Sequence, residues 1–394
     1  MKIKNYLKTD SFLSLSASVV CIVLGLFIGA VILFCIDPSA FWNEGFKRIL
    51  MGGFYMRPIG IGREIANAAP LIMTGLSVAF AFKTGLFNIG AAGQYTLGAF
   101  GAILSAIVFG WPWWLCLICA TVFGALWGAI PGFFKAYLNI NEVISAIMFN
   151  WIGLYIVNTI MYGNGLSPMY DTNKAKTYSL KSVFPDSVIP NLGLGKLFKN
   201  DSTTIAIFLA ILVAIVIYII VNKTTFGFEL KACGYNKNAA KYAGINEKKS
   251  IILSMFLAGG LAGFGAGLYY LSSVAEWNPL ASTALPAMGF NGISVALLAS
   301  SNPIGCIFSA LLISHITTGG SFMNANIFPI EIANIVTGVI IYLCAFTALF
   351  KGKIVEFMKK KVYKTEKEEV AAAVLPENEE TPAEETEEGK ESEA

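Results

Sequence analysis

The sequence has 394 residues, of which 56% are hydrophobic and only 13% are charged, against about 25% charged residues in an ordinary soluble domain. This low charge excludes a soluble enzyme, a disordered chain and a nucleic-acid-binding module. Several apolar runs reach the roughly 20 residues that a helix needs to cross the hydrocarbon core of a bilayer. The predicted fold class is therefore all-α, a polytopic membrane protein.

The net charge of +3 combines two unlike parts of the chain. From Lys364 onward there are 12 Glu and 3 Lys, a net of −9, so residues 1–363 carry +12. The acidic part is too poor in apolar residues to fold. We divide the chain into 1–64 (a cytoplasmic segment, the first span and an outer segment), 65–350 (the core of spans) and 351–394 (a disordered acidic tail in the cytoplasm).

Hydropathy predicts about ten transmembrane helices. The run that follows Lys2, Lys4 and Lys8 is about twice as long as a secretory signal core and lacks a cleavage site, so we expect it to remain as the first helix. The spans, in chain order, are about 13–36, 65–83, 88–110, 113–134, 142–162, 203–222, 250–272, 284–300, 303–319 and 329–350.

The distribution of Lys and Arg sets the expected orientation. With the N-terminus inside, the inner segments hold 13 Lys before the acidic tail, against nine Lys and Arg in the outer segments 37–64 and 163–202. Positive residues are enriched in short cytoplasmic loops. We expect a multi-pass membrane protein with both termini in the cytoplasm.

Small residues recur at helix-packing spacing in two spans. Gly124, Gly128 and Gly132 lie four apart, and the span 250–272 has the same spacing at residues 259, 263 and 267. Such stripes let two helices approach closely. There is also a short internal similarity, since 86–90 reads LFNIG and 289–293 reads GFNGI. Repeated halves are common in transporters.

Polar side chains inside spans are costly and usually face the bundle interior or an aqueous cavity. Amides donate and accept hydrogen bonds without charge, which suits a pathway for a neutral, hydroxyl-rich or heterocyclic solute; interhelical hydrogen bonds are the other interpretation. For Glu142, capping of a helix N-terminus is favoured over a proton relay. We interpret the lone His315 as a hydrogen-bonded packing residue. The candidate pathway residues are Asn88, Gln94, Asn141, Glu142, Asn150 and Asn291.

The loop 223–249 contains a candidate docking element. Asn236 is suited to cap a short helix that runs through Tyr242, and Gly244 to end it in a left-handed conformation. A short capped helix between two spans is either a handle for another protein or a surface connector. The sequence has no phosphate-binding loop of the G-x-x-x-x-G-K-[ST] type and no catalytic or metal-ligand spacing. We therefore expect no ATP hydrolysis, no cofactor and no metal on this chain.

Four ordered segments resemble permease subunits of bacterial ABC importers for nucleosides, within the wider ribose/branched-chain amino acid permease family. They read GLFNIGAAGQ (85–94), NEVISAIMFN (141–150), NKNAAKYAGI (236–245) and GFNGISVALL followed by NPIG (289–298 and 302–305). Two positions depart from the family pattern: Ala92 stands where an acidic residue is common, and Ser300-Ser301 where a Gly-Arg pair is common. The N-terminal extension resembles the larger of the two nucleoside permeases in such systems.

The resemblance implies a permease fold of the type II ABC importer class and a set of partners. These are two ATPase subunits that carry ATP and Mg²⁺, a second and different permease chain, and an extracytoplasmic substrate-binding lipoprotein that delivers the nucleoside. Phe87 and Phe149 would be available to stack on a base. The implied ATPase-coupling residues are Asn236, Lys237, Ala239, Ala240, Lys241, Tyr242 and Gly244.

Other functions remain open at this point. The shared motifs indicate architecture better than substrate, so ribose, other sugars, riboflavin and branched-chain amino acids are alternatives within the same class. From a different class, an ion-coupled secondary transporter would need a titratable group in the pathway, for which Glu142 and Glu331 are the nearest candidates.

Overall fold

The computed structural model describes residues 10–345 and residue 352. Within these residues seven helices are long and apolar enough to cross a membrane, and shorter apolar helices occupy the remaining predicted spans. The ten helices are α2 (Asp10–Ile36), α4 (Ile59–Lys83), α5 (Ala91–Ile107), α6 (Trp113–Leu138), α7 (Glu142–Tyr162), α10 (Ala206–Lys223), α13 (Glu247–Leu271), α14 (Ala287–Leu298), α15 (Pro303–Ser321) and α16 (Ile330–Ala345). The prediction of a polytopic helical membrane protein is confirmed.

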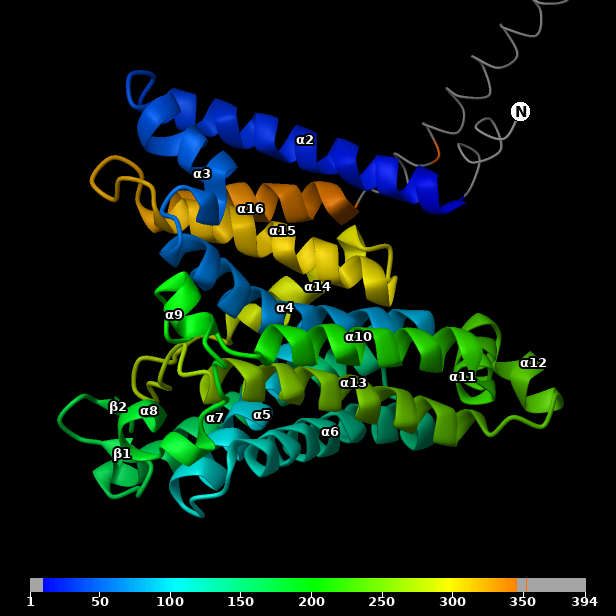
Figure 1. The fold of residues 1–394 in the computed structure, drawn as a ribbon. Coiled ribbons are helices and arrows are strands. Elements are labelled where there is room, and N and C mark those ends of the chain that lie inside the picture. Colours follow the sequence, from blue (N-terminus) through cyan, green and yellow to red (C-terminus); the bar gives the residue numbers. More distant parts are fainter. Residues whose placement is uncertain (1–9, 346–351, 353–394) are drawn as a thin grey trace, which may run out of the picture.

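Short elements join these helices at the two ends of the bundle (Figure 1). The α12 end carries α11 (Thr225–Tyr235) and α12 (Lys237–Tyr242). The opposite, hairpin end carries helical turns at Phe41–Phe46, Gly52–Phe54, Gly163–Gly165 and Pro185–Ser187, together with α3 (Lys47–Met51), α8 (Leu180–Val183), α9 (Leu194–Phe198) and the antiparallel strands β1 (Tyr170–Asp171) and β2 (Lys176–Thr177). α2 begins and α16 ends toward the α12 end (Figure 1).

Helices α4 and α13 form the buried centre of the bundle. In their apolar windows 83% and 72% of the residues are buried, whereas the corresponding values for α2 and α10 are 22% and 28%. α2 packs on α16, where Gly29 faces Val336. A bilayer requires a bundle whose lipid-facing surface is apolar and whose polar or small residues face its interior.

The predicted glycine stripes bring α6 and α13 into direct backbone contact. A Cβ on Gly259 would lie 2.3 Å from the carbonyl oxygen of Gly124, and one on Gly263 would lie 2.4 Å from that of Ala120. Both distances are shorter than any tolerated contact. The prediction of close helix packing at these stripes is confirmed, and this contact holds the α6–α13 face rigid.

Replacing Gly259 with Ala should therefore destabilise the protein by about 1–3 kcal/mol, the usual range for overpacking. The added methyl group meets backbone, which cannot move aside as a side chain can. The thermal midpoint of the purified chain in detergent measures the effect. Gly338→Ala is the matched control, since a Cβ on this helical glycine of α16 meets nothing within 4 Å. An unchanged midpoint for Gly259→Ala would contradict this account of the interface.

Two helices are shorter than their predicted spans. The spans 88–110 and 284–300 correspond to helices that begin only at Ala91 and Ala287. In the first case Gly85 has a φ of +74° and lies against the backbone of Gly234, so the chain turns at this point instead of continuing as a helix. In the second, Pro286 immediately precedes the helix. The predicted tail lies outside the described residues apart from residue 352.

Candidate functional site

The segment between α4 and α5 folds back into the bundle and places two amides in its interior. Asn88 donates to Ser77 Oγ at 3.0 Å, and Ser77 lies about 9 Å along α4 from the end of that helix at a rise of about 1.5 Å per residue. Asn88 and Gln94 form a reciprocal amide pair, with N···O distances of 2.8 and 3.0 Å. Both side chains are buried, at 0% and 1% exposed.

Asn150 of α7 joins the same cluster through the backbone. Its Oδ1 accepts a hydrogen bond from Gly93 N at 2.8 Å, and its Nδ2 donates to the carbonyl of Ile89 at 3.0 Å. Gly93 belongs to the first turn of α5, whose N–H groups have no partner within the helix. A side chain from another helix therefore caps the interior start of α5 and fixes the preceding turn.

The second short helix begins beside the first. A Cβ on Gly289, in the first turn of α14, would lie 2.3 Å from Cα of Ala92, in the first turn of α5. The two similar segments 86–90 and 289–293 are thus brought to one place. Asn291 of α14 is half-buried, and no hydrogen bond is recorded for its side chain in the described part of the chain. Discontinuous helices that meet inside the bundle are where transporters commonly place their substrate sites.

This interior cluster is uncharged and closed. The side chains of Asn88, Gln94 and Asn150 are buried and hydrogen-bonded to protein partners, so in this conformation a solute cannot reach them. The hydroxyl of Tyr95, the residue after Gln94 in α5, is buried without a partner in the described structure. A polar solute would have to exchange these internal hydrogen bonds for its own when the helices move.

The two aromatic candidates pack against different partners. Phe87 stacks on Phe82, with ring centroids 5.1 Å apart and planes 16° apart. Phe149 packs edge-on against Trp127 at 5.5 Å. Both rings are half-buried. Their role in stacking on a base stays a prediction.

Asn141 and Glu142 lie apart from the interior cluster, at the start of α7. Asn141 is exposed and caps the helix by accepting from Val143 N at 2.8 Å. Glu142 pairs with Lys135 of α6 at 2.9 Å. The predicted capping function belongs to Asn141 itself, while Glu142 adds a carboxylate to the first turn, where the helix dipole favours it.

His315 is hydrogen-bonded, as predicted. Its two ring nitrogens lie 3.0 Å from Glu64 Oε2 and 3.0 Å from the carbonyl oxygen of Leu50. Glu64 also accepts from Gly53 N. The sequence did not single out Glu64, because the predicted span began at residue 65 whereas α4 begins at Ile59.

The short helix in the loop 223–249 has the predicted ends. Asn236 Oδ1 accepts hydrogen bonds from the N–H groups of Asn238 and Ala239, both at 3.0 Å. Gly244 has a φ of +83°, and the N–H of Ile245 donates to the carbonyl of Ala240, which closes a Schellman motif. These predictions are confirmed. A second helix, α11, precedes α12 and was not predicted.

Large aromatic side chains are almost fully exposed on α11 and α12. Tyr242 is 95% exposed and Tyr235 is 91% exposed. Lys237, Ala239 and Lys241 are also exposed, whereas Ala240 is only 4% exposed and holds α12 onto the bundle. Tyr is enriched at the centres of protein interfaces. We call the exposed faces of α11 and α12 the handle.

At the hairpin end, two segments form a lid over the bundle: 170–177, which contains β1 and β2, and 272–286, which leads into α14. Trp277 is 3% exposed, and its Nε1 donates to Asn158 Oδ1 of α7 at 2.9 Å. The N–H of Thr177 donates to the carbonyl of Trp277 at 2.8 Å. Lys176 and Glu276 form an ion pair at 2.8 Å. The lid thus links α7, α13 and the hairpin.

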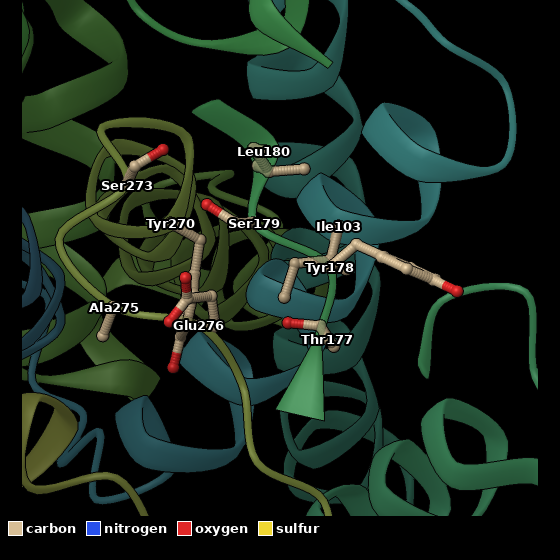
Figure 2. Close-up of a pocket in the computed structure, with 9 residues that line it drawn as sticks. All are labelled: Ile103, Thr177, Tyr178, Ser179, Leu180, Tyr270, Ser273, Ala275 and Glu276. Carbon is tan, nitrogen blue, oxygen red and sulfur yellow. The ribbon is translucent and has the colours of Figure 1, made fainter. Parts of the chain in front are cut away.

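Beneath the lid lies a cavity with room for about one water molecule, with a volume of about 10 Å³ (Figure 2). Its lining includes Ser273, whose hydroxyl is buried without a partner in the described structure. Figure 2 shows the Tyr178 side chain directed away from the Glu276 carboxylate. The lid therefore packs closely on α5 and α13 at this point, through Ile103 and Tyr270.

The lid should loosen in acid. The hydrogen bond from Lys176, together with its positive charge, holds the pKa of Glu276 below its usual value. A lowered pKa in the folded state adds stability above the unfolded pKa of about 4.3, and this stability is lost as pH falls through the folded value. Protection of the Thr177 amide from hydrogen exchange, corrected for intrinsic rate, should hold from pH 7 to about 5 and fall below about 4. In the Glu276→Gln variant, protection of the Thr177 amide should already be reduced at pH 7. A pH profile of protection identical to that of the wild type would contradict this account of the lid.

Residues 61–345 match the family described as "Branched-chain amino acid transport system / permease component". The chain belongs to this permease family. It is 35% identical over 336 residues to the nucleoside ABC transporter permease protein NupB of Lactococcus lactis, covering 83% of this chain and 89% of that protein. It is also 35% identical over 339 residues to the guanosine ABC transporter permease protein NupP of Bacillus subtilis, covering 83% and 91%. No solved structure matches significantly.

The structure of this permease brings together only some of the predicted site residues. Asn88, Gln94 and Asn150 form one cluster and Asn291 lies near it, whereas Asn141 and Glu142 lie at the start of α7. Sequence reasoning missed Ser77 and the lid residues Asn158, Thr177 and Trp277. Asn158 could have been found from the sequence, since it is an amide within the predicted span 142–162. Which of these residues contact substrate stays a prediction.

Proposed function

We propose that this permease is the pathway-forming subunit of an ABC importer for nucleosides. The observation that carries the proposal is the 35% identity to NupB and NupP over more than four fifths of both chains, which takes in the lid, the interior cluster and the handle. The protein named for glucose transport, TsgB13 of Haloferax volcanii, is more distant, at 25% identity. Sugars and branched-chain amino acids are thus second to nucleosides as substrates.

The proposed complex contains a second, different permease. The chain also matches NupC of L. lactis at 27% and NupQ of B. subtilis at 30% identity, so each of these organisms has two homologous permeases, and this chain is more similar to NupB and NupP. The exposed apolar face of α7, with Met148 and Tyr155 each 60% exposed, offers a surface for such a partner. An extracytoplasmic lipoprotein would deliver nucleoside at the hairpin end.

ATP hydrolysis would occur on separate ATPase subunits bound to the handle. The residues that build or present α12 are Asn236, Lys237, Ala239, Ala240, Lys241, Tyr242 and Gly244. The exposed rings of Tyr242 on α12 and Tyr235 on α11 suit burial in a groove of another protein. On this proposal the α12 end, and with it the starting end of α2, would lie in the cytoplasm. ATP-driven motion of the subunits would then open the passage alternately at the two ends.

The substrate route would pass the interior cluster. We expect Asn88, Gln94, Asn150 and Asn291 to offer hydrogen bonds to a nucleoside in an open state, with Phe87 and Phe149 near its base and Asn141 and Glu142 at the cytoplasmic exit. A neutral solute needs no fixed charge in its path, and the cluster contains none. This chemistry favours a nucleoside over an amino acid, whose ammonium and carboxylate would need charged partners.

Uptake by whole cells tests this function. Radiolabelled guanosine or another nucleoside should accumulate in cells that express the complete system, with unlabelled nucleosides competing and ribose and leucine not competing. Accumulation should stop when ATP is depleted and continue in an uncoupler that preserves ATP. Loss of uptake in the uncoupler alone would support the ion-coupled secondary transporter, and competition by ribose or leucine would assign a different substrate.

A further inference from the structure

We propose that the cavity at the α12 end is a binding site for a phosphate group, carried either by an anionic phospholipid or by free phosphate. The cavity has a volume of about 220 Å³. It lies where the loop after α4 meets α6, α11, α12 and α13, and its lining includes Lys135, Lys237, Ser250, Cys233, Leu230 and Ile251. This site goes beyond the proposed function and does not depend on it.

The charges around the cavity leave it with a net positive charge of one. Lys135 pairs with Glu142 at 2.9 Å, so these two charges cancel. No ion pair is recorded for Lys237 in the described residues. An ammonium group has three donors, and Lys135 uses one of them on Glu142, so donors remain on both lysines. One phosphate diester would neutralise this charge.

The hydroxyl of Ser250 is an independent indication of a polar ligand, because the residue is largely buried while its hydroxyl stays open to the cavity. Ser250 is only 7% exposed, and no hydrogen bond is recorded for its side chain in the described structure. A hydroxyl in such a recess hydrogen-bonds to water or to a bound molecule. Because Ser250 lines the cavity, a ligand oxygen there would supply the partner.

The apolar part of the cavity lining is the reason for naming a phospholipid as one of the two sources of the phosphate group. Leu230 and Ile251 are 1% and 8% exposed and line the same cavity as the lysines. A site with cations beside apolar side chains, at one end of a helix bundle, fits a headgroup and its glycerol. Basic pockets between membrane helices on the cytoplasmic side bind anionic lipid headgroups in this way.

The position of the site links it to the handle. Lys237 is the first residue of α12, Lys135 lies in the last turn of α6 and Ser250 lies in the first turn of α13. A phosphate held by all three would tie α12 to the bundle. The ligand would thereby fix the handle in the position that a partner protein contacts.

Cys233 allows the site to be tested in the full-length chain, because this free thiol lines the cavity. Alkylation of Cys233 by N-ethylmaleimide is followed by peptide mass spectrometry in nanodiscs of phosphatidylcholine, in nanodiscs containing phosphatidylglycerol, and in phosphatidylcholine with inorganic phosphate against chloride of equal ionic strength. We expect at least fivefold slower alkylation with one or both phosphate sources. The exposed free thiol Cys35 on α2 should not change.

The two arms identify the source of the phosphate. Protection by phosphatidylglycerol alone assigns a lipid headgroup, and protection by inorganic phosphate assigns a free anion. Equal reactivity of Cys233 in all three conditions would overturn the proposal.

Matched variants test the residues. Lys135→Gln combined with Lys237→Gln should abolish the protection, and Ser250→Ala, which keeps both charges, should weaken it. Lys241→Gln combined with Lys249→Gln removes the same charge from α12 and α13 at exposed lysines outside the cavity lining and should keep it. Protection that persists in the first pair would overturn the site. The assay needs no ATPase and no nucleoside, so its failure is distinguishable from failure of the proposed function.

Discussion

Replacing Ala239 with Glu is expected to abolish ATP-driven uptake while the permease still folds. Ala239 is exposed on the handle, three residues after the capping Asn236. Glu at this third helical position is favourable for the helix itself, because a carboxylate there interacts with the free N–H groups. When an ATPase binds over this position, the same carboxylate would be buried without a partner, which costs several kcal/mol of binding free energy. This cost corresponds to a loss of more than about 100-fold in the affinity of the ATPase for the permease.

Co-purification of the ATPase with this permease, together with nucleoside uptake, measures the effect. Asn222→Glu is the matched control, since it adds the same charge at an exposed position near the end of α10, before α11 and α12 begin. We expect the control to retain assembly and uptake. Normal uptake by Ala239→Glu would show that α12 is a surface connector and not the coupling element.

Replacing Asn150 with Ala should give the largest loss of stability among single substitutions of the amides. The change leaves the buried N–H of Gly93 and the part-buried carbonyl of Ile89 without their partner. Each unsatisfied group costs about 1–3 kcal/mol, so the sum is about 2–6 kcal/mol. The thermal midpoint in detergent should fall, and hydrogen exchange in residues 89–93 should rise before exchange elsewhere in α5.

Asn222→Ala provides the comparison for Asn150→Ala. This exposed amide makes one hydrogen bond, to the carbonyl of Tyr218, and water replaces it when the side chain is removed. The free energy of unfolding of Asn222→Ala should remain within about 0.5 kcal/mol of wild type, so its thermal midpoint should barely change. If the two variants lose equal stability, the cap on α5 is not what holds the interior segment in place.

The membrane helices and α12 could be predicted because their causes are local in sequence. A run of apolar residues specifies a span wherever it occurs, and the ends of α12 follow from Asn236 and Gly244 alone. The glycine stripes predicted that α6 and α13 would be packed closely, since the spacing itself makes the smooth surface.

The break before α5 could not be predicted in the same way. The turn at Gly85 depends on Gly234, almost 150 residues later in the chain, and the start of α5 depends on Asn150 of another helix. Hydropathy averages over such a break and extends the span across it. The lid was missed for the same reason, because Trp277, Thr177 and Asn158 interact only once the outer segments have folded over the bundle.

The interior amides show the limit of reading function from residue type. An amide within a span indicated a polar pathway, yet Asn88, Gln94 and Asn150 first satisfy one another and the backbone. Structural and transport functions are compatible, because a group that exchanges hydrogen bonds between two states can serve both. Only a state in which these internal hydrogen bonds are broken would offer the amides to a solute.

Reconstitution into vesicles tests the central claim that this chain is a passive pathway driven by a separate ATPase. Vesicles that contain this permease, its partner permease, the ATPase subunits and the lipoprotein should accumulate nucleoside only when ATP is supplied to the α12 side. Vesicles that contain this chain alone should neither hydrolyse ATP nor accumulate solute. Accumulation of nucleoside by this single polypeptide would contradict the account.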